Sequence, residues 1–337
     1  RPLVAYGLAE LGVGALCALT PSAFATLSEA YVSLARSGMG LLGLTAARGT
    51  LTFLVILLPT TCMGATLPLL TRLFAGREEG AARLPQLYAV NTFGGAVGAL
   101  LSAYWILPTL GIRGTMYGAA LVNVAIAALA VLLGGGLRAM APSERPASEA
   151  VGPRTPLDLL AFAFASGFLV FAVEVVQTHL LTLLIGNSAY AFGLMLTAFL
   201  VCLSAGAALA PRLAARMGKA ALVWGLALSA LGLALMTPLW DQLPRLFAAA
   251  GKVTDSWALR ELVRALAAFA MLTLPTLAMG TTFPLLLSRI GAEPDVAKHT
   301  ARLTIASTCG TILGSVATGY LILPRLGSQG SLRAIAV

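Results

Sequence analysis

Long uncharged stretches dominate the pattern of polar and apolar positions along this chain. Seven of them contain no Lys, Arg, Asp or Glu: residues 49–71, 84–112, 114–137, 180–211, 220–240, 265–288 and 303–324. A helix needs about 20 mostly apolar residues to cross a bilayer. The pattern therefore predicts an all-α polytopic membrane protein, because a β-barrel would show short segments of alternating polarity instead.

These stretches predict about nine full spans and the start of a tenth. The spans are expected near residues 2–20, 49–71, 85–107, 113–135, 157–185, 190–211, 219–238, 263–287, 302–324 and, for the tenth, 330–337. Residues 21–46 are expected to form a weakly amphipathic connection. Residues 136–156 are rich in Pro, Ser, Ala and charge, a composition typical of a flexible linker. The linker divides the chain into an N-terminal half, 1–135, and a C-terminal half, 157–337.

One short stretch occurs twice. LPTTCMGATLPLL at 58–70 and LPTLAMGTTFPLL at 274–286 share nine of thirteen residues at an offset of 216. Proline inside a helix removes a hydrogen bond and clashes with the carbonyl four residues earlier, where each copy has a glycine. Each copy therefore predicts a kinked helix, either a static bend or a gate of a transporter. The residues concerned are Pro59, Gly64, Pro68, Pro275, Gly280 and Pro284.

The repeat continues beyond this motif. Residues 87–111 align without a gap to 303–327, with ten identities in twenty-five and again an offset of 216. An even number of steps separates the matching spans, so both copies cross the membrane in one direction. This is the parallel repeat that relates the two halves of major facilitator transporters. Six spans a half make a twelve-span design, so we expect two further spans before Arg1 and completion of the tenth after Val337.

The charges support a membrane location and an orientation. The chain is 58% hydrophobic and 10% charged, whereas about a quarter of a soluble domain is charged. The net charge of +9 is not taken as a sign of nucleic-acid binding, because the basic residues lie between spans. The side that carries the linker has 13 of the 22 Lys and Arg residues. The positive-inside rule therefore places the linker in the cytoplasm.

Glu174 is the leading candidate for function, because an ionisable residue inside a span costs roughly 2.5–3.5 kcal/mol on insertion scales. Gln177, Thr178 and Thr182 share its helical face, and His179 lies near the edge of that face. Two interpretations remain open. The face lines a substrate or proton pathway, or it forms an interior hydrogen-bond cluster that fixes helix packing.

Two other polar residues lie within predicted spans. Glu10 is expected to serve interior packing or binding. Asn91 lies beside a ladder of small residues, Gly94, Gly98 and Ser102, and the second copy has Ser307 beside the matching ladder Gly310, Gly314 and Thr318. Such ladders let helix backbones approach closely. A packing interface is the simpler interpretation of the glycines, and a role in a cavity stays open for Asn91.

Other chemistry has no support in the sequence. The four cysteines, Cys17, Cys62, Cys202 and Cys309, fall inside predicted spans without metal-ligand or disulfide spacing. We find no catalytic triad, P-loop or zinc signature. The sequence therefore predicts no catalytic residue, no metal and no cofactor in this chain.

Four pieces together resemble the membrane region of bacterial fused major facilitator/spermidine synthase-like proteins. They are YGLAELGVG, LPTTCMGATLPLL, LYAVNTFGGAVGAL with ILPTLG, and SGFLVFAVEVVQTHLLTLLIGNSAYAF. The resemblance implies a bundle in the bacterial inner membrane, commonly followed by a soluble aminopropyltransferase-like domain, of which this chain contains nothing. Glu174 matches the family pattern. Val173, Gln177 and His179 stand where the family usually has Tyr, Trp and Arg.

Three functions are expected from these features. The first is secondary transport or binding of a small organic solute, for which the carboxylates and the resemblance favour a polyamine-like cation. The second is a membrane anchor or scaffold, for a spermidine synthase-like domain or as a subunit of a larger complex. The third, an enzyme, needs a catalytic domain beyond Val337. The expected partners are the lipid bilayer, a small solute and a protein or fused domain, but no nucleic acid.

Overall fold

A computed structural model describes residues 2–72, 80–136, 155–218, 220–253, 256–290 and 296–336. These residues form helices joined by short connections, with no strand among them. Eight helical stretches in this part of the chain are long and apolar enough to cross a membrane. Many large apolar side chains on them are exposed, as expected for helices that face lipid. The helices thus support the prediction of a multi-pass membrane protein. Most of the predicted linker, residues 137–154, lies outside the described residues.

The chain divides into two compact units. The first unit comprises residues 1–73 and 106–151, and the second comprises residues 74–105 and 152–337. Helix α3 (Gly80–Leu101) therefore clusters with helices of the C-terminal part of the chain, although it comes before the linker. Each unit is described by itself below.

Several helices are longer than the sequence predicts. Helix α1 runs from Pro2 to Arg36, so the expected span at 2–20 and much of the expected connection form one helix that contains Pro21. Helix α2 (Leu41–Thr71) begins before residue 49, and helix α9 (Trp257–Ile290) begins before residue 263. The predicted boundaries were wrong here because they followed hydropathy. A helix continues through polar residues as long as its backbone hydrogen bonds are made.

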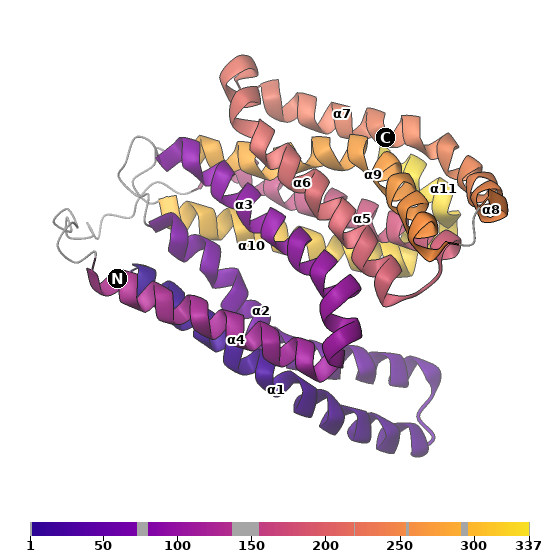
Figure 1. The fold of residues 1–337 in the computed structure, drawn as a ribbon. Coiled ribbons are helices and arrows are strands. Elements are labelled where there is room, and N and C mark those ends of the chain that lie inside the picture. Colours follow the sequence, from indigo (N-terminus) through magenta and orange to yellow (C-terminus); the bar gives the residue numbers. More distant parts are fainter. Residues whose placement is uncertain are drawn as a thin grey trace. The chain divides into compact units, whose positions relative to one another are not determined.

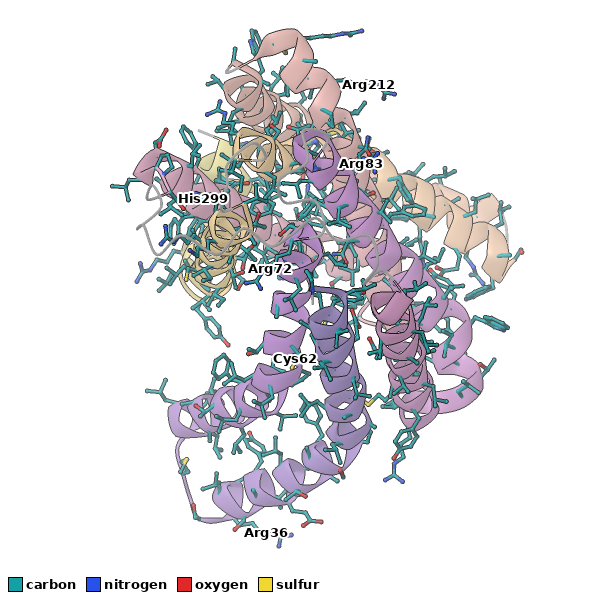
Figure 2. The ribbon with its side chains drawn as sticks, turned by 90° about the vertical axis from the view of Figure 1, so that its left-hand side faces the viewer. Arg36, Cys62, Arg72, Arg83, Arg212 and His299 are labelled. Carbon is teal, nitrogen blue, oxygen red and sulfur yellow. The ribbon has the colours of Figure 1, made fainter. Side chains whose placement is uncertain are left out.

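The first unit contains α1, α2 and α4 (Leu107–Gly136). Helices α1 and α4 pack through small residues and run in opposite directions. A Cβ atom added at Gly7 would lie 3.0 Å from the carbonyl oxygen of Ala127, and one added at Gly14 would lie 3.0 Å from that of Ala120. Figure 2 shows that α2 changes direction near Cys62, which lies between its two internal prolines.

The second unit holds α3 and all elements after the linker. In chain order these are α5 (Leu157–Ile185), α6 (Ala189–Met217), α7 (Ala220–Met236), η4 (Thr237–Gln242), α8 (Leu243–Val253), α9, α10 (Val296–Ala317), η5 (Thr318–Ile322) and α11 (Leu323–Ala336). Figure 1 shows α3 beside α6 and α10 beside α5, and both pairs are in extensive contact. Two apolar clusters form the interior. One surrounds Phe199 and Leu272, and the other surrounds Leu286 and Leu303.

Glycines set the closest helix contacts of this unit. A Cβ atom at Gly280 of α9 would overlap the carbonyl oxygen of Leu203 in α6. Cβ atoms at Gly310 and Gly314 of α10 would overlap the carbonyl oxygens of Phe164 and Phe168 in α5. Glycine is therefore required wherever these backbones touch, as is typical of helix packing in membranes.

The turn between α5 and α6 forms where the sequence GNS predicts one. Helix α5 ends at Ile185, and Gly186 takes a left-handed φ of 87°. The side chain of Ser188 then caps α6 by accepting a hydrogen bond of 3.1 Å from the backbone N–H of Ala191. Such a cap satisfies one of the free donors at the start of a helix.

The two copies of the sequence repeat carry the same local structure. Helices α3 and α10 each begin and end at positions 216 residues apart. Each is followed by a five-residue π-helix, η2 (Ser102–Ile106) and η5, again at that offset. Gly111 and Gly327, at the same offset, both break the following helix with a φ of 65°. Helices α2 and α9 also begin 216 residues apart.

We predict that Gly310→Ala lowers the free energy of unfolding by about 1–3 kcal/mol, because the added methyl group forces α10 away from α5. The matched control is Gly118→Ala in α4, where a Cβ atom meets no described residue within 4 Å. That change should stabilise the protein by up to about 1 kcal/mol, because alanine is the better helix former. Thermal unfolding in detergent measures both. Equal effects of the two substitutions would contradict the close contact.

Candidate functional site

Helix α5 carries the leading candidate, Glu174, near its middle. The side chain of Glu174 is partly buried. The hydroxyls of the same helical face bond to their own backbone: Thr178 donates to the carbonyl of Glu174 at 2.6 Å, and Thr182 donates to that of Thr178 at 2.7 Å. Because these threonine hydroxyls donate to backbone carbonyls of their own helix, the polar groups of this face that remain are the carboxylate of Glu174 and the amide of Gln177.

Gln177 lies one turn after Glu174 and is only 1% exposed. Among the described residues, neither its amide nitrogen nor its amide oxygen has a hydrogen-bond partner. Val173, Val176 and Leu181, which flank it in α5, belong to the apolar cluster around Phe199. A buried polar group left unpaired costs about 1–3 kcal/mol. The amide of Gln177 is therefore a buried donor and acceptor that no other described residue satisfies.

The N-terminal part of the same α5 face is used for packing. The Ser166 hydroxyl lies 2.6 Å from that of Thr282 in α9, and both residues are buried. A Cβ atom at Gly167 would overlap the backbone of Ser307 in α10. This part of α5 therefore matches the hypothesis of an interior cluster that fixes helix packing. Glu174 and Gln177 lie further along the same face and do not take part in these contacts.

The other predicted site residues do not join this pair. The side chain of His179 is exposed on α5, and that of Asn91 is exposed on α3. Glu10 belongs to the first unit, where the Tyr6 hydroxyl, one turn earlier in α1, is hydrogen-bonded to its carboxylate. The structure therefore brings together Glu174, Gln177 and Thr178 on α5, and leaves Asn91 and Glu10 in other surroundings.

The predicted kink residues lie in two different environments. Pro275, Gly280 and Pro284 are buried in α9, and the position of Gly280 is explained by the contact of its backbone with Leu203. Pro59, Gly64 and Pro68 lie within α2, whose only buried residue is Thr71. Whether either helix acts as a gate stays a prediction.

A second polar group, at the start of α9, is one that the sequence did not single out as a site. Glu261 is 9% exposed, accepts a hydrogen bond of 2.9 Å from the Tyr104 hydroxyl, and forms an ion pair with Arg264. Tyr104 also packs edge-on against Tyr190, at 5.3 Å between ring centroids, and Tyr190 packs against Trp257 at 6.0 Å. This cluster joins η2, α6 and α9. The sequence did contain one sign of this group: Glu261 and Arg264 lie three residues apart on a helix, at the edge of a predicted span, where they can pair.

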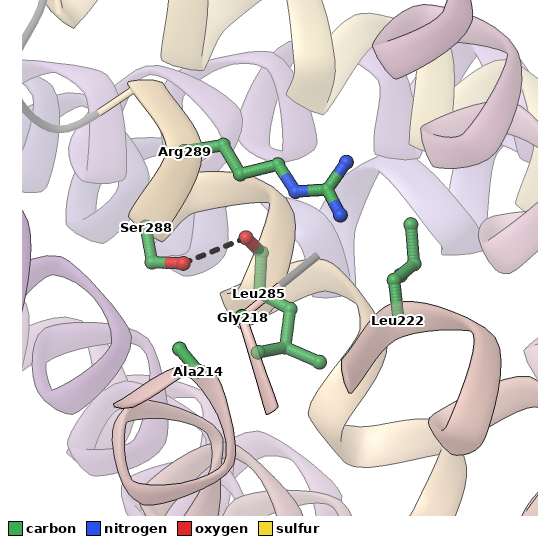
Figure 3. A pocket seen from close by; sticks show the side chains of 6 residues that line it. All are labelled: Ala214, Gly218, Leu222, Leu285, Ser288 and Arg289. Carbon is green, nitrogen blue, oxygen red and sulfur yellow. Dashed lines mark hydrogen bonds between the residues drawn. The ribbon is translucent and has the colours of Figure 1, made fainter. Parts of the chain in front are cut away.

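A small cavity lies where α6, α7 and α9 meet. Its volume is about 210 Å³. Figure 3 shows Arg289 and Leu222 at its sides, and Ser288 donating to the carbonyl of Leu285 at 2.8 Å. Ala214 and Gly218 complete the lining. None of the predicted site residues lines this cavity, and Ser288 already uses its donor.

Metal ligation finds no support in the part of the chain that the structure describes. Within it, no three His, Cys, Asp or Glu side chains come together in a way that could hold a metal ion. The four cysteines are free. His299, a candidate ligand by type, is buried with its Nδ1 2.8 Å from the hydroxyl of Thr155, near the end of the predicted linker.

Comparisons with known proteins add no relative: no protein-family model matches the chain, and neither a curated protein nor a solved structure matches it.

We predict that Gln177→Leu raises the free energy of unfolding of the ligand-free protein by about 1–3 kcal/mol, because it removes an unpaired buried amide. The matched control is Gln86→Leu at an exposed position of α3, which should change stability by less than about 0.5 kcal/mol. Thermal unfolding in detergent measures both. A loss of stability in Gln177→Leu would show that the amide is already satisfied.

We also predict that Tyr104→Phe lowers the free energy of unfolding by about 1.5–3 kcal/mol, because the buried carboxylate of Glu261 loses a donor. The control is Tyr320→Phe, at the equivalent position of the second copy, where the side chain is 70% exposed. Combining Tyr104→Phe with Glu261→Gln should give less than the sum of the two single effects. Additive effects would contradict the hydrogen bond.

Proposed function

We propose that the chain is a major-facilitator-like module that binds, and by secondary transport moves, a small organic solute. The observation that carries the proposal is the buried, unpaired amide of Gln177 one turn from the partly buried Glu174, within a helix long enough to cross a membrane. Polar and ionisable groups in such positions are costly and mark substrate or proton pathways. The parallel repeat, with its matching π-helices, supports the choice of a two-fold transporter architecture.

The solute that best fits these groups is a polyamine-like cation. A carboxylate attracts an ammonium group, and the amide oxygen of Gln177 accepts a hydrogen bond from the same or a neighbouring N–H group. Residues 174 and 177 lie about 5–6 Å apart at their Cβ atoms on a helix surface, close enough to hold one amine together. The apolar walls from Val173 and Val176 suit the methylene chain of such a solute.

Uptake into proteoliposomes tests the proposal. We expect the purified chain to take up radiolabelled spermidine or putrescine, and Glu174→Gln to abolish that uptake because the carboxylate that binds the amine is lost. The control is Glu29→Gln, which removes an exposed carboxylate of α1 and should leave uptake unchanged. Vesicles with the unsubstituted protein that take up neither polyamines nor amino acids would overturn the proposal.

A second function, a membrane anchor or scaffold for an enzyme domain or a larger complex, is favoured by a different observation. Within the described part of the chain, Thr71 is the only buried residue of α2, and the helix carries exposed apolar residues along its length. A helix whose apolar side chains are exposed offers a surface on which another protein could pack. Stable co-purification of a partner protein, together with no binding of any solute that depends on Glu174, would favour this function over transport.

A further inference from the structure

A second buried polar group without a partner lies on the helix that follows α10. The side chain of Thr318 is 0% exposed, and its hydroxyl has no hydrogen-bond partner among the described residues. Thr318 is the first residue of the π-helix η5, which contacts α5. Short π-helices are rare and occur frequently at functional sites. Thr318 is thus in the same unpaired state as Gln177, on an element that adjoins the helix of Gln177.

The close packing of α5 against α10 shows where Thr318 lies along α5. Two contacts set the register of these parallel helices: the carbonyl oxygens of Phe164 and Phe168 in α5 meet Gly310 and Gly314 in α10. A helical carbonyl points toward the following turn, so Gly314 is level with the turn after Phe168. Thr318 comes one turn later in the chain than Gly314. It is therefore level with the next turn of α5, which contains Glu174.

Glu174 also lies on the side of α5 that packs against α10. Gly167, two helical turns before Glu174, approaches the backbone of Ser307 in α10. Residues seven positions apart lie on nearly the same face of a helix, so Glu174 continues this contact face. Leu323, the residue directly after η5, packs on the apolar cluster to which the α5 residues Val173 and Val176 belong. The middle of α5 and η5 are therefore neighbours.

We propose that Thr318 is a third binding residue of the site formed by Glu174 and Gln177, and that this site selects a primary ammonium group. The inference rests on the function proposed above. A primary ammonium group carries three N–H donors. The three side chains offer it a carboxylate, an amide oxygen and a hydroxyl oxygen as acceptors. A cation without N–H donors would leave the buried amide and hydroxyl unpaired.

Helix packing by itself does not explain a hydroxyl at position 318. Valine has nearly the same shape as threonine and would fill this position without burying an unpaired polar group, which costs stability. Thr300 provides a comparison on the same helix. Its side chain is also 0% exposed, with no described hydrogen-bond partner for its hydroxyl, but it lies about five turns before Thr318 and so far from Glu174.

Thr318→Val tests the assignment, because it removes the hydroxyl and keeps the shape of the side chain. Without solute, we expect the melting temperature in detergent to rise by about 2 °C, since a buried unpaired hydroxyl is lost. Binding of putrescine to the purified protein, measured by calorimetry, should weaken by about 10- to 100-fold, since the ammonium group loses one hydrogen bond. A residue that serves only packing would not give these two opposite effects.

Thr300→Val is the matched control. We expect it to raise the melting temperature as Thr318→Val does, and to leave the affinity for putrescine unchanged. An unchanged affinity for putrescine in Thr318→Val, or a fall in its melting temperature, would overturn the role of Thr318 while leaving the proposed function in place. An unsubstituted protein that binds no amine would overturn the proposed function and this inference together.

A second test uses the unsubstituted protein, so it does not depend on the folding of a variant. Putrescine is compared with its derivative in which both amines are fully methylated. The derivative keeps both charges and their spacing but has no N–H donor. We expect it to bind about 1,000-fold more weakly or not at all, because a site built to hydrogen-bond a solute rejects an analogue that lacks those groups. Equal affinity for the two cations would show that charge alone is recognised and would overturn the selection of a primary ammonium group.

Discussion

Contact between helix backbones through glycine is the interaction on which the second unit depends. Within a membrane, burial of apolar surface gives helices little reason to associate, so packing and polar contacts must hold them together. Glycines at 280, 310 and 314 let carbonyl groups of α5 and α6 come into direct contact with α9 and α10. These contacts fix the position of α5, and therefore of the polar groups that it carries.

Rigid placement of α5 explains how Gln177 remains buried without a partner. The helix is held by α9 at Ser166 and by α10 at Gly167, so it cannot rotate to bring the amide to a polar surface. Burying the unpaired amide costs free energy, and the packing of the surrounding helices must offset that cost. In the function proposed above, a bound polar solute would supply the hydrogen bonds that the Gln177 amide lacks among the described residues.

Local structure was largely predictable from the sequence. Runs without charge identified the helices, the GNS turn separated α5 from α6, and the offset of 216 recurred in the π-helices and in the two positive-φ glycines. Helix ends were predicted less well, since α1 and α9 extend through polar residues that hydropathy assigns to connections. The Tyr104–Glu261 bond was missed, because it joins residues 157 positions apart.

The sequence by itself determined that this is a helical membrane protein with an internal repeat, because hydropathy and identity at a fixed offset are properties of the chain alone. It also marked Glu174 and Gln177 as unusual for a span. Only the tertiary structure decided, for the residues that it describes, that Gln177 is buried without a partner and that Asn91 is exposed. It also decided that equivalent glycines of the repeat contact another helix in the second copy and meet no described residue in the first. Those differences depend on which helices lie alongside, and the residues of one helix do not specify its neighbours.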